Sequence, residues 1–224
     1  MIGNKSFQGV IFDVDATLVD TISVINDIWQ TWSTVNSIDF ETVYPYIHGR
    51  KVNETLSYVN QKLNNEDEIS KIKLIAIEKM SYAKPISGAV DFVNKIPSHL
   101  WGIATSGPYD IAKKSLSSSG FTLPNVMVCG ENVQRGKPNP EPFITAATAL
   151  GFAPEQCVVF EDSPAGIRSA KDVGCYTVAL RTSHTDDELY QADTIINNFN
   201  DIYIVMRNKN TSINIYRNLL CQRS

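Results

Sequence analysis

Two pairs of acidic residues follow short apolar segments of the chain. Asp13 and Asp15 come after GVIF, and Glu161 and Asp162 come after CVVF. Side chains two residues apart on an extended strand point the same way, so Asp13 and Asp15 can address one site. Neighbouring carboxylates repel unless a proton, a cation or a donor lies between them, and hard carboxylate oxygens are the ligands that Mg²⁺ prefers. Taken alone, either pair has a simpler interpretation: solvated loop acids for the first, helix capping for the second.

Two other segments carry groups suited to an anion. Thr105, Ser106 and Gly107 close the run LWGIATSG, where hydroxyls and free backbone N–H groups at a strand-to-helix turn can cradle a phosphate. The alternative is an ordinary helix cap. Lys137 lies in RGKPNPEP, whose prolines stiffen the chain. A lysine held on such a rigid turn is suited to be a fixed counter-charge to phosphate. A solvated loop lysine would look the same in isolation.

The elements that must position these residues alternate along the chain. We expect strands at Gly9–Asp15, Leu100–Ser106, Asn125–Cys129, Cys157–Asp162, Cys175–Leu180 and Thr194–Ile196, and helices at Tyr109–Ser119, Pro142–Leu150, Ala165–Val173 and Asp186–Ala192. This alternation predicts βαβ units and a parallel sheet. The fold class is therefore α/β, a Rossmann-like three-layer core. The carboxyl ends of its strands share one crevice, which would gather the acid pairs, the hydroxyls and the lysine.

The segment from Thr21 to Ala83 breaks this alternation. Ile25, Ile28 and Trp29 recur at helical spacing, a turn follows near residues 45–49, and two further helical stretches run on to residue 80. We predict a helical cap at residues 19–83, inserted into a core made of residues 1–18 and 84–224. Such an insert leaves and re-enters at neighbouring points, so it could close over the strand ends. The polar and then apolar C-terminal stretch is compatible with a hairpin, a short helix or a frayed tail.

Composition excludes several classes of protein. The 224 residues are 43% hydrophobic and 20% charged, which is typical of a globular chain. A net charge of −4 without a long basic run argues against nucleic acid or an anionic membrane as partner. The four cysteines match no zinc spacing and are expected to be small, buried hydrophobic residues, with disulfides as the second choice. No 18-residue apolar run and no secretory leader stand out, so we expect a cytoplasmic protein.

The motifs together resemble the haloacid dehalogenase (HAD) superfamily, in the branch with a cap after the first strand. FDVDATLVDT, IATSG, GKPNPEPF and VFEDSPAGI resemble that family's four motifs in order, from Val10 to about Ala179. Within this superfamily, the motif sequences resemble those of sugar-phosphate phosphatases, glycerol-3-phosphatases, 2-deoxyglucose-6-phosphate phosphatases and β-phosphoglucomutases. The resemblance implies a Mg²⁺-dependent phosphatase, a phosphoric monoester hydrolase, that acts on a small phosphorylated sugar or polyol and works as a monomer.

The resemblance also implies a role for each matched residue. Asp13 would be the nucleophile that forms an aspartyl-phosphate, and Asp15 the general acid and then base. Phosphate would be bound by the core residues Thr105, Ser106 and Lys137. Mg²⁺ would be bound by Asp13, the main-chain carbonyl of Asp15 and Asp162, with Glu161 in the first or second shell. In the cap, His48, Arg50 and Lys51 form a cationic cluster that would either read the substrate or start a solvated helix.

One position departs from the family's pattern. Ala16 stands where the first motif normally has glycine. A positive φ there would cost alanine on the order of 1 kcal/mol, whereas a negative φ would only narrow the mouth of the site. A sugar phosphomutase of the β-phosphoglucomutase type is the main alternative function, because it shares the same core residues. A metal-free dehalogenase and a non-catalytic binding module are weaker alternatives.

Overall fold

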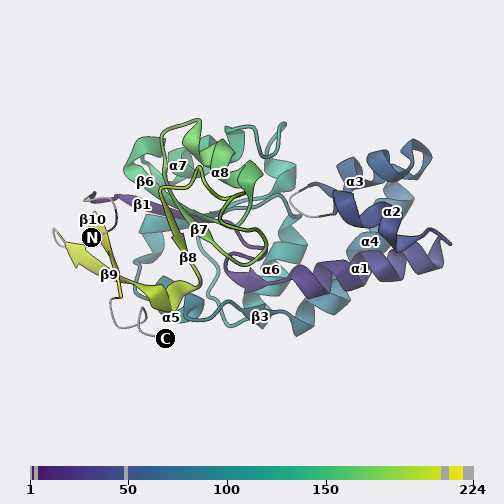
Figure 1. Cartoon of the computed structure of the whole chain (residues 1–224), viewed down its shortest axis with the longest axis horizontal. Helices are drawn as coiled ribbons and strands as arrows, with labels where there is room; N and C mark the ends of the chain where they lie inside the picture. The colour runs from purple at the N-terminus through teal and green to yellow at the C-terminus, as the bar shows by residue number, and fades with distance from the viewer. Residues whose placement is uncertain (1, 3–4, 48–49, 208–211, 219–224) are drawn as a thin grey trace.

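A parallel sheet of six strands forms the core of the protein (Figure 1). The computed structural model describes residues 2, 5–47, 50–207 and 212–218. In spatial order the sheet runs β5, β4, β1, β6, β7, β8, and every neighbouring pair is parallel. The strands are β1 (Gly9–Phe12), β4 (Trp101–Ala104), β5 (Val126–Val128), β6 (Cys157–Glu161), β7 (Tyr176–Leu180) and β8 (Thr194–Ile196). All six lie where the sequence predicts them.

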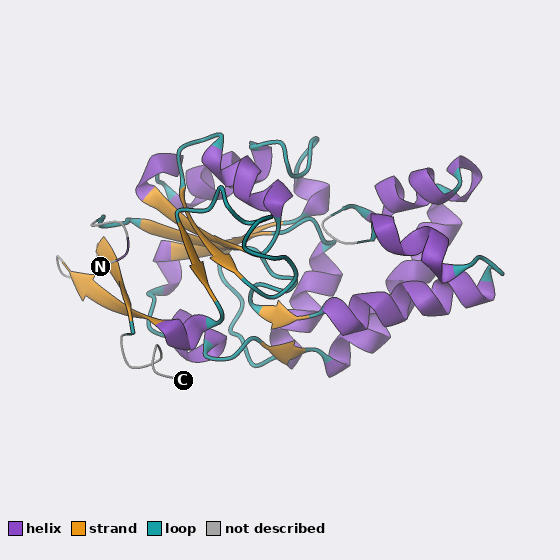
Figure 2. Ribbon diagram, in the orientation of Figure 1, coloured by secondary structure: helices purple, strands orange, loops and turns teal. Residues whose placement is uncertain are grey.

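Helices cover both faces of this sheet, as Figure 2 shows. On one face, Ile11 of β1 packs with residues of α7 (Glu141–Leu150) and α8 (Pro164–Lys171). On the other face, Phe12 contacts α5 (Ala89–Val93) and the short 3₁₀ helix η8 (Phe199–Asp201). Successive residues of a strand point to opposite faces, so this run of apolar residues supports two cores at once. The predicted three-layer α/β architecture is confirmed.

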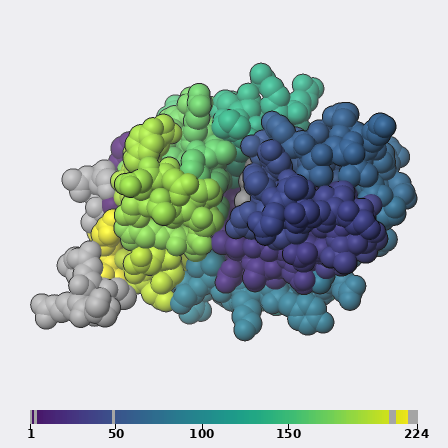
Figure 3. All heavy atoms as spheres, turned by 45° about the vertical axis from the view of Figure 1, so that its right-hand side comes forward, coloured from purple at the N-terminus to yellow at the C-terminus, as the bar shows by residue number. Residues whose placement is uncertain are grey.

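Four helices form the insert that follows the first strand, and they lie against one end of the core in the space-filling view (Figure 3). They are α1 (Ile22–Val35), α2 (Phe40–Val43), α3 (Val52–Val59) and α4 (Glu66–Lys79), with short 3₁₀ turns η2 (Tyr44–Tyr46), η3 (Gln61–Leu63) and η4 (Met80–Tyr82). Two short strands, β2 (Val19–Asp20) and β3 (Lys84–Pro85), pair antiparallel where the chain leaves and re-enters the core. The insert is therefore attached through a two-stranded ribbon.

Aromatic packing and a buried hydrogen bond join the two long helices of the insert. Trp29 and Trp32 on α1 pack edge to face with ring centroids 5.4 Å apart. The Trp32 indole N–H donates to the buried Glu68 carboxylate of α4 at 2.8 Å, and Lys71 pairs with the same carboxylate. Asn65 caps the start of α4 by accepting from the backbone N–H of Glu68. The paired helices α1 and α4 are thus a defined unit.

One segment contradicts its sequence-based prediction, and another decides between alternatives that the sequence left open. The predicted helix at Asp186–Ala192 is wrong: the segment forms turns, in which Arg181 pairs with Asp186 and the Thr185 backbone N–H and hydroxyl donate to Glu188. The C-terminal stretch is an antiparallel hairpin of β9 (Ile202–Arg207) and β10 (Ser212–Arg217). Helix α6 (Tyr109–Ser118) forms where it was predicted.

The remaining predictions concern cysteines and membranes. Cys129, Cys157 and Cys175 are buried free thiols, in line with the expectation that they act as small hydrophobic residues, and Cys221 lies outside the described residues. Among the described residues, none of the helices has both the length and the apolar character that crossing a bilayer requires.

Candidate active site

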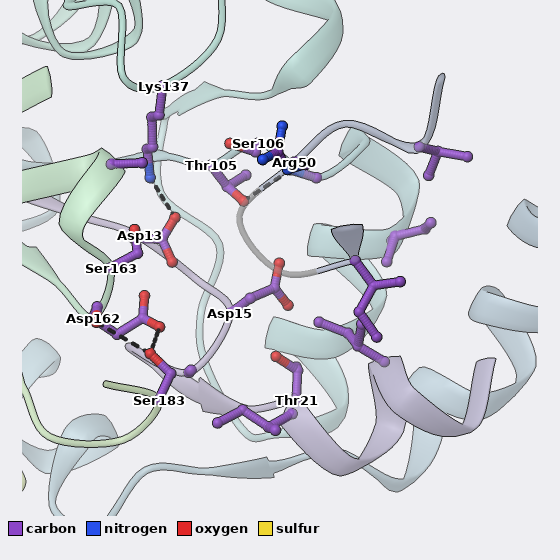
Figure 4. A pocket seen from close by; sticks show the side chains of 18 of the residues that line it. Asp13, Asp15, Thr21, Arg50, Thr105, Ser106, Lys137, Asp162, Ser163 and Ser183 are labelled. Atoms are coloured by element: carbon purple, nitrogen blue, oxygen red, sulfur yellow. Dashed lines mark hydrogen bonds and ion pairs between the residues drawn. The ribbon is translucent and has the colours of Figure 1, made fainter. Parts of the chain in front are cut away.

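The predicted catalytic residues meet at the carboxyl ends of three neighbouring strands. Asp13 follows β1, Thr105 follows β4, and Asp162 follows β6. With Asp15 and Lys137 they line a cavity of about 400 Å³ between the sheet and the helical insert. In Figure 4 the three aspartates point into the same space, with Lys137 above Asp13. The sheet order, rather than closeness in sequence, brings them together.

Lys137 holds the Asp13 carboxylate in place. Its ammonium lies 2.6 Å from Oδ1 of Asp13 and also donates to Oε1 of Glu161. The lysine side chain is only 4% exposed. Burial lowers the pKa of Lys137, but the two carboxylates outweigh that effect and raise it, so the group stays charged. Burial raises the pKa of Asp13 well above its usual value, and Lys137 opposes that rise.

Glu161 supports Lys137 from beneath and does not line the cavity. Its Oε2 accepts from the backbone N–H groups of Asp162 and Ser163, both at 3.0 Å, and from the Ser163 hydroxyl. Its carboxylate also packs against Gly166 of α8, where a Cβ would lie 1.9 Å from Oε1. The fully buried Glu161 carboxylate is thus occupied by the Lys137 ammonium on one oxygen and by the loop after β6 on the other.

Ser163 links this carboxylate to a helix start. Its hydroxyl accepts from the Gly166 N–H at 3.2 Å, which makes it the N-cap of α8, and Pro164 follows at the first helical position. The same loop thus begins a helix and fixes two acids at the strand end.

Asp162 borders the cavity and has partners from two loops. The Thr17 hydroxyl donates to its Oδ1 at 3.3 Å, and the Ser183 hydroxyl donates to its Oδ2. Burial and the nearby Glu161 raise the pKa of Asp162 to about 7. His184 also lines the cavity, with Nδ1 3.1 Å from the Asp162 carbonyl oxygen.

Sequence reasoning missed Ser183 and His184, although the signal was present. They follow β7, which is the next strand after β6 in the sheet. The strand-end argument that found Asp13, Thr105 and Asp162 applies to this loop as well.

Asp15 occupies the side of the cavity nearest the insert. Burial raises its pKa, while the Thr21 hydroxyl and Lys137 lower it. The Thr21 hydroxyl is buried and points toward Asp15 (Figure 4), and it makes no hydrogen bond of ordinary geometry within the described residues. Thr21, which the sequence analysis also missed, therefore acts on the charge of Asp15 at the edge of the cavity.

Ala16 takes the more costly of the two conformations considered for it. Its φ is +58°, in the left-handed region that favours glycine. Its N–H donates to the Val19 carbonyl at 2.8 Å, and its carbonyl accepts from the Thr182 hydroxyl. The surrounding turn imposes this conformation on an alanine that is 3% exposed and borders the cavity.

Thr105, Ser106 and Gly107 form the predicted turn after β4. The Thr105 hydroxyl accepts from the Gly107 N–H at 3.1 Å, and the Thr105 N–H donates to the Val128 carbonyl at 2.9 Å. All three residues line the cavity. A Cβ on Gly130 would lie 2.5 Å from the Ser106 carbonyl oxygen, so close packing of a second loop fixes this turn.

The cationic cluster of the insert divides into residues with different surroundings. Arg50 lines the cavity, and its guanidinium carbon lies 4.7 Å from the centre of the Tyr58 ring. Lys51 instead donates to the carbonyls of Gly130 at 2.7 Å and Val133 at 3.2 Å, across to the core. His48 lies outside the described residues. The structure thus brings Arg50 to the cavity and gives Lys51 a contact between insert and core.

The donor set of this site suits a hard cation. No group of three or more His, Cys, Asp or Glu side chains among the described residues is arranged as a metal cluster. The set implied by the sequence, however, needs only two carboxylates and a main-chain carbonyl. Asp13 and Asp162 both line the cavity, both are buried, and the charge of Asp162 raises the pKa of Asp13. A cation between them would relieve that repulsion.

Comparison with known proteins identifies the family. A model of the haloacid dehalogenase-like hydrolases matches residues 10–180. The chain therefore belongs to the haloacid dehalogenase-like hydrolases, as its four motifs indicated. Within that family it is a phosphatase, a phosphoric monoester hydrolase.

Curated relatives match over most of their length. Hexitol phosphatase A of Escherichia coli is 30% identical over 206 residues, which covers 88% of this chain and 94% of the relative. Glycerol-1-phosphate phosphohydrolase 2 of Saccharomyces cerevisiae is 28% identical, with 88% and 84% covered.

Solved structures share the fold. The crystal structure of CbbY from Rhodobacter sphaeroides in complex with phosphate superposes with a TM-score of 0.74 at 20% identity and covers 86% of this chain and 95% of that chain. A putative β-phosphoglucomutase from Thermotoga maritima gives a TM-score of 0.63 at 26% identity, with 84% and 94% covered. The capped α/β fold agrees with both.

Proposed function

We propose that this protein is a Mg²⁺-dependent phosphatase that hydrolyses a small phosphorylated sugar or polyol through an aspartyl-phosphate. The observation that carries the proposal is the buried Asp13 carboxylate, held by Lys137 in a cavity shared with Asp15 and Asp162. The names of the relatives, which include hexitol and glycerol-1-phosphate phosphatases, supply the substrate class.

In this proposal the core residues divide the chemistry among them. Asp13 attacks phosphorus, the P–O bond to the ester oxygen breaks, and the phosphoryl group is transferred to the carboxylate while the alkoxide leaves. Asp15, whose pKa is raised by burial, protonates the leaving alkoxide and then takes a proton from the water that hydrolyses the aspartyl-phosphate. The Thr105 hydroxyl, the Ser106 backbone and the Lys137 ammonium bind the phosphoryl oxygens and offset their charge.

Asp13, the main-chain carbonyl of Asp15, and Asp162 are the residues that would hold Mg²⁺. The cation, when bound, screens the negative charges of nucleophile and phosphate that must approach one another. Glu161 would act through Lys137 and the loop to Ser163 rather than touch the cation. Thr17 and Ser183 orient the Asp162 carboxylate.

The proposed division of the chain is a core of residues 1–18 and 84–224 and a cap of residues 19–83. The β2–β3 ribbon at the two junctions supports these boundaries, and the Trp32–Glu68 bond ties together the long helices between them. A cap that opens on this ribbon would admit substrate and exclude water on closing. We further propose that the protein works as a monomer.

Phosphate release from a panel of phosphorylated sugars, polyols and nucleotides tests the function. Release should require Mg²⁺, stop with chelator, and vanish in Asp13→Asn. Asp91→Asn, an exposed acid on α5, is the matched control and should keep full activity. Folded Asp13→Asn protein that still releases phosphate would refute the assigned nucleophile, and silence of the wild type across the panel would refute the phosphatase.

A sugar phosphomutase is the second candidate, and the likeness to the putative β-phosphoglucomutase structure favours it. The two functions share the aspartyl-phosphate and differ in what receives the phosphoryl group. Transfer from a labelled phosphoenzyme to an added sugar phosphate, in preference to water, would identify the mutase. Release of inorganic phosphate at the rate of substrate loss would identify the phosphatase.

A further inference from the structure

The loop after β7 is bonded to two other loops of the candidate site. The Thr182 hydroxyl donates to the carbonyl of Ala16, and the Ser183 hydroxyl donates to Oδ2 of Asp162 (Figure 4). His184 follows, and its half-buried side chain lines the same cavity. The proposed mechanism assigns roles to the aspartates, the buried lysine and the turn after β4, whereas His184 has none in it.

Contacts on both sides of His184 fix the backbone of this loop. The Arg181 guanidinium, before it, donates to Oδ2 of Asp186, after it, at 2.7 Å, so an ion pair spans the loop. The Thr185 N–H and hydroxyl both donate to Glu188 at 2.9 Å. The imidazole is therefore presented by a loop closed by its own bonds, and little conformational entropy remains to be lost when it binds a ligand.

The neighbours of the imidazole determine which nitrogen carries the proton. Nδ1 lies 3.1 Å from the Asp162 carbonyl oxygen and 2.6 Å from the Ser183 hydroxyl oxygen. A carbonyl oxygen only accepts, and the one hydroxyl proton of Ser183 is directed to the Asp162 carboxylate. Nδ1 therefore meets two lone pairs and is the N–H donor. The neutral ring then has a lone pair on Nε2, at the edge of the ring away from Asp162.

The position of β7 in the sheet sets how far His184 lies from the phosphoryl site. The proposed nucleophile Asp13 follows β1, β6 lies beside β1, and β7 is the next strand. Neighbouring strands are about 4.8 Å apart, so β7 lies roughly 10 Å from β1. Thr105, which binds the phosphoryl group in the proposed mechanism, follows β4 on the opposite side of β1. His184 is thus placed to reach a hydroxyl several bonds from phosphorus rather than the phosphoryl oxygens.

A sugar or polyol brings hydroxyl groups that donate as well as accept hydrogen bonds. Arg50 lines the cavity from the insert, but a guanidinium can only donate. Glu54, also from the insert, already accepts the Lys51 N–H. A hydroxyl that leaves water without gaining an acceptor costs binding free energy. The Nε2 lone pair of His184 supplies such an acceptor from the core.

We propose that His184 is a substrate-binding residue whose Nε2 accepts a hydrogen bond from a hydroxyl of the sugar or polyol part of the substrate. This proposal rests on the phosphatase function proposed above and adds a residue to it. The bond from Nδ1–H to the Asp162 carbonyl orients the ring for this role. His184 should therefore favour hydroxylated alcohols over alkyl alcohols of the same length.

Two pairs of monophosphates with equal carbon number test the proposal: glycerol 1-phosphate against propyl phosphate, and sorbitol 6-phosphate against hexyl phosphate. His184→Asn keeps an amide N–H near the position of Nδ1 and loses the acceptor at Nε2. We expect it to lower kcat/KM about five- to tenfold, mainly through KM, for the polyol phosphate that the wild type prefers. The alkyl phosphates should change by less than about twofold, because they have no hydroxyl to donate.

Two further variants accompany this comparison. His184→Gln can place an amide oxygen near the position of Nε2 and should recover most of the lost kcat/KM. His99→Asn changes an exposed histidine that precedes β4, at the other end of the sheet, and should alter none of the four reactions. His184→Phe keeps a ring and loses both nitrogens, so it gives the same comparison should His184→Asn fail to fold.

Each variant is compared with the wild type on the same substrate, so differences in leaving-group acidity cancel. An equal loss for polyol and alkyl phosphates in folded His184→Asn would mean that His184 acts through Asp162 or the loop. That result, or unchanged kcat/KM for all four compounds, would overturn the proposal and leave the phosphatase intact. Hydrolysis of none of the four by the wild type would instead refute the proposed function.

Discussion

The Lys137 ammonium lies 2.6 Å from Oδ1 of Asp13, and both side chains are almost completely buried. The lysine reaches this position from the loop before α7, whereas Asp13 is fixed at the end of β1. Since Lys137 also donates to Glu161, one cation serves two carboxylates. The charge of the proposed nucleophile therefore depends on a residue 124 positions away in the chain.

Lys137→Met should lower both stability and turnover. Without the ammonium, two buried carboxylates lose their counter-charge, which should cost about 3 kcal/mol of unfolding free energy. Loss of one charged donor to the phosphoryl group should reduce kcat about 10²- to 10³-fold. Urea denaturation and steady-state kinetics measure the two effects, and Lys95→Met, at an exposed lysine, is the control. Wild-type kcat in Lys137→Met would contradict the assignment.

Ala16→Gly should stabilise the protein. Alanine at a φ of +58° carries strain that glycine lacks, although glycine also has more freedom in the unfolded chain. We expect a net gain of about 0.5–1 kcal/mol, seen as a Tm increase of roughly 1–4 °C. Ser37→Gly, at the other positive-φ non-glycine position described, should give a similar gain far from the site. A lower Tm for Ala16→Gly would show that the strain argument fails.

The stabilising effect of Mg²⁺ should grow with pH. The pKa of Asp162 is about 7 in the folded protein and near 3.8 when unfolded, so between these values the folded state holds a proton that the unfolded state lacks. The metal-free protein must then lose stability as pH rises through this window. Mg²⁺ competes with that proton, so the Tm increase it causes should be larger at about pH 8 than at about pH 5.5.

Thermal unfolding with and without Mg²⁺ at the two pH values measures this dependence. Asp162→Asn removes the titrating carboxylate and should abolish most of the Tm increase caused by Mg²⁺ at both pH values. An equal Mg²⁺ effect at the two pH values in the wild type would contradict the assignment of Asp162 as a ligand.

Lys51→Met should loosen the contact between insert and core. Methionine keeps most of the side-chain length and loses the hydrogen bonds to the carbonyls of Gly130 and Val133. We expect KM to rise roughly tenfold with kcat within about twofold, because the open form gains population. The substrate-free variant should also show a larger radius of gyration by small-angle scattering. Lys62→Met, an exposed lysine of the insert, should show neither change.

Scattering separates this role from substrate binding. A lysine that only contacts substrate would leave the radius of gyration of the free protein unchanged. That result, together with a raised KM, would return Lys51 to the substrate-binding group in which the sequence analysis placed it.

The strand ends could be predicted from the sequence because each is marked locally. Three apolar runs stop at Asp13, Thr105 and Glu161, so the sequence indicates both the strand and the polar residue that follows it. The period of two could also have separated Glu161 from Asp162, since adjacent residues of a strand point to opposite sides. That difference is what the structure shows: Asp162 borders the cavity, and Glu161 supports Lys137 from behind.

The contacts between distant segments could not be predicted in this way. Lys51 bonds to carbonyls 79 and 82 residues later, and no local pattern states that pairing. Likewise, the segment after Thr185 has a helical pattern and even a bond from the Thr185 N–H to Glu188 of the kind that starts helices, yet it forms turns.

Gly166→Ala should disturb the catalytic site from outside it. A Cβ at this position of α8 would lie 1.9 Å from Oε1 of Glu161, so the carboxylate must move and Lys137 loses a partner. We expect a stability loss of about 1–3 kcal/mol from overpacking, and kcat lowered about tenfold or more as Lys137 shifts. Denaturant unfolding and steady-state kinetics measure the two effects.

Two companion variants distinguish this mechanism from general damage to the helix. Gly151→Ala, at a positive φ with open space around it, should lose about 1 kcal/mol of stability with kcat unchanged. Glu161→Asp shortens the obstructing side chain, so in the Gly166→Ala background it should recover part of the lost activity. Full activity in Gly166→Ala, or a double variant that is worse than both singles combined, would mean that Glu161 does not transmit the steric change to Lys137.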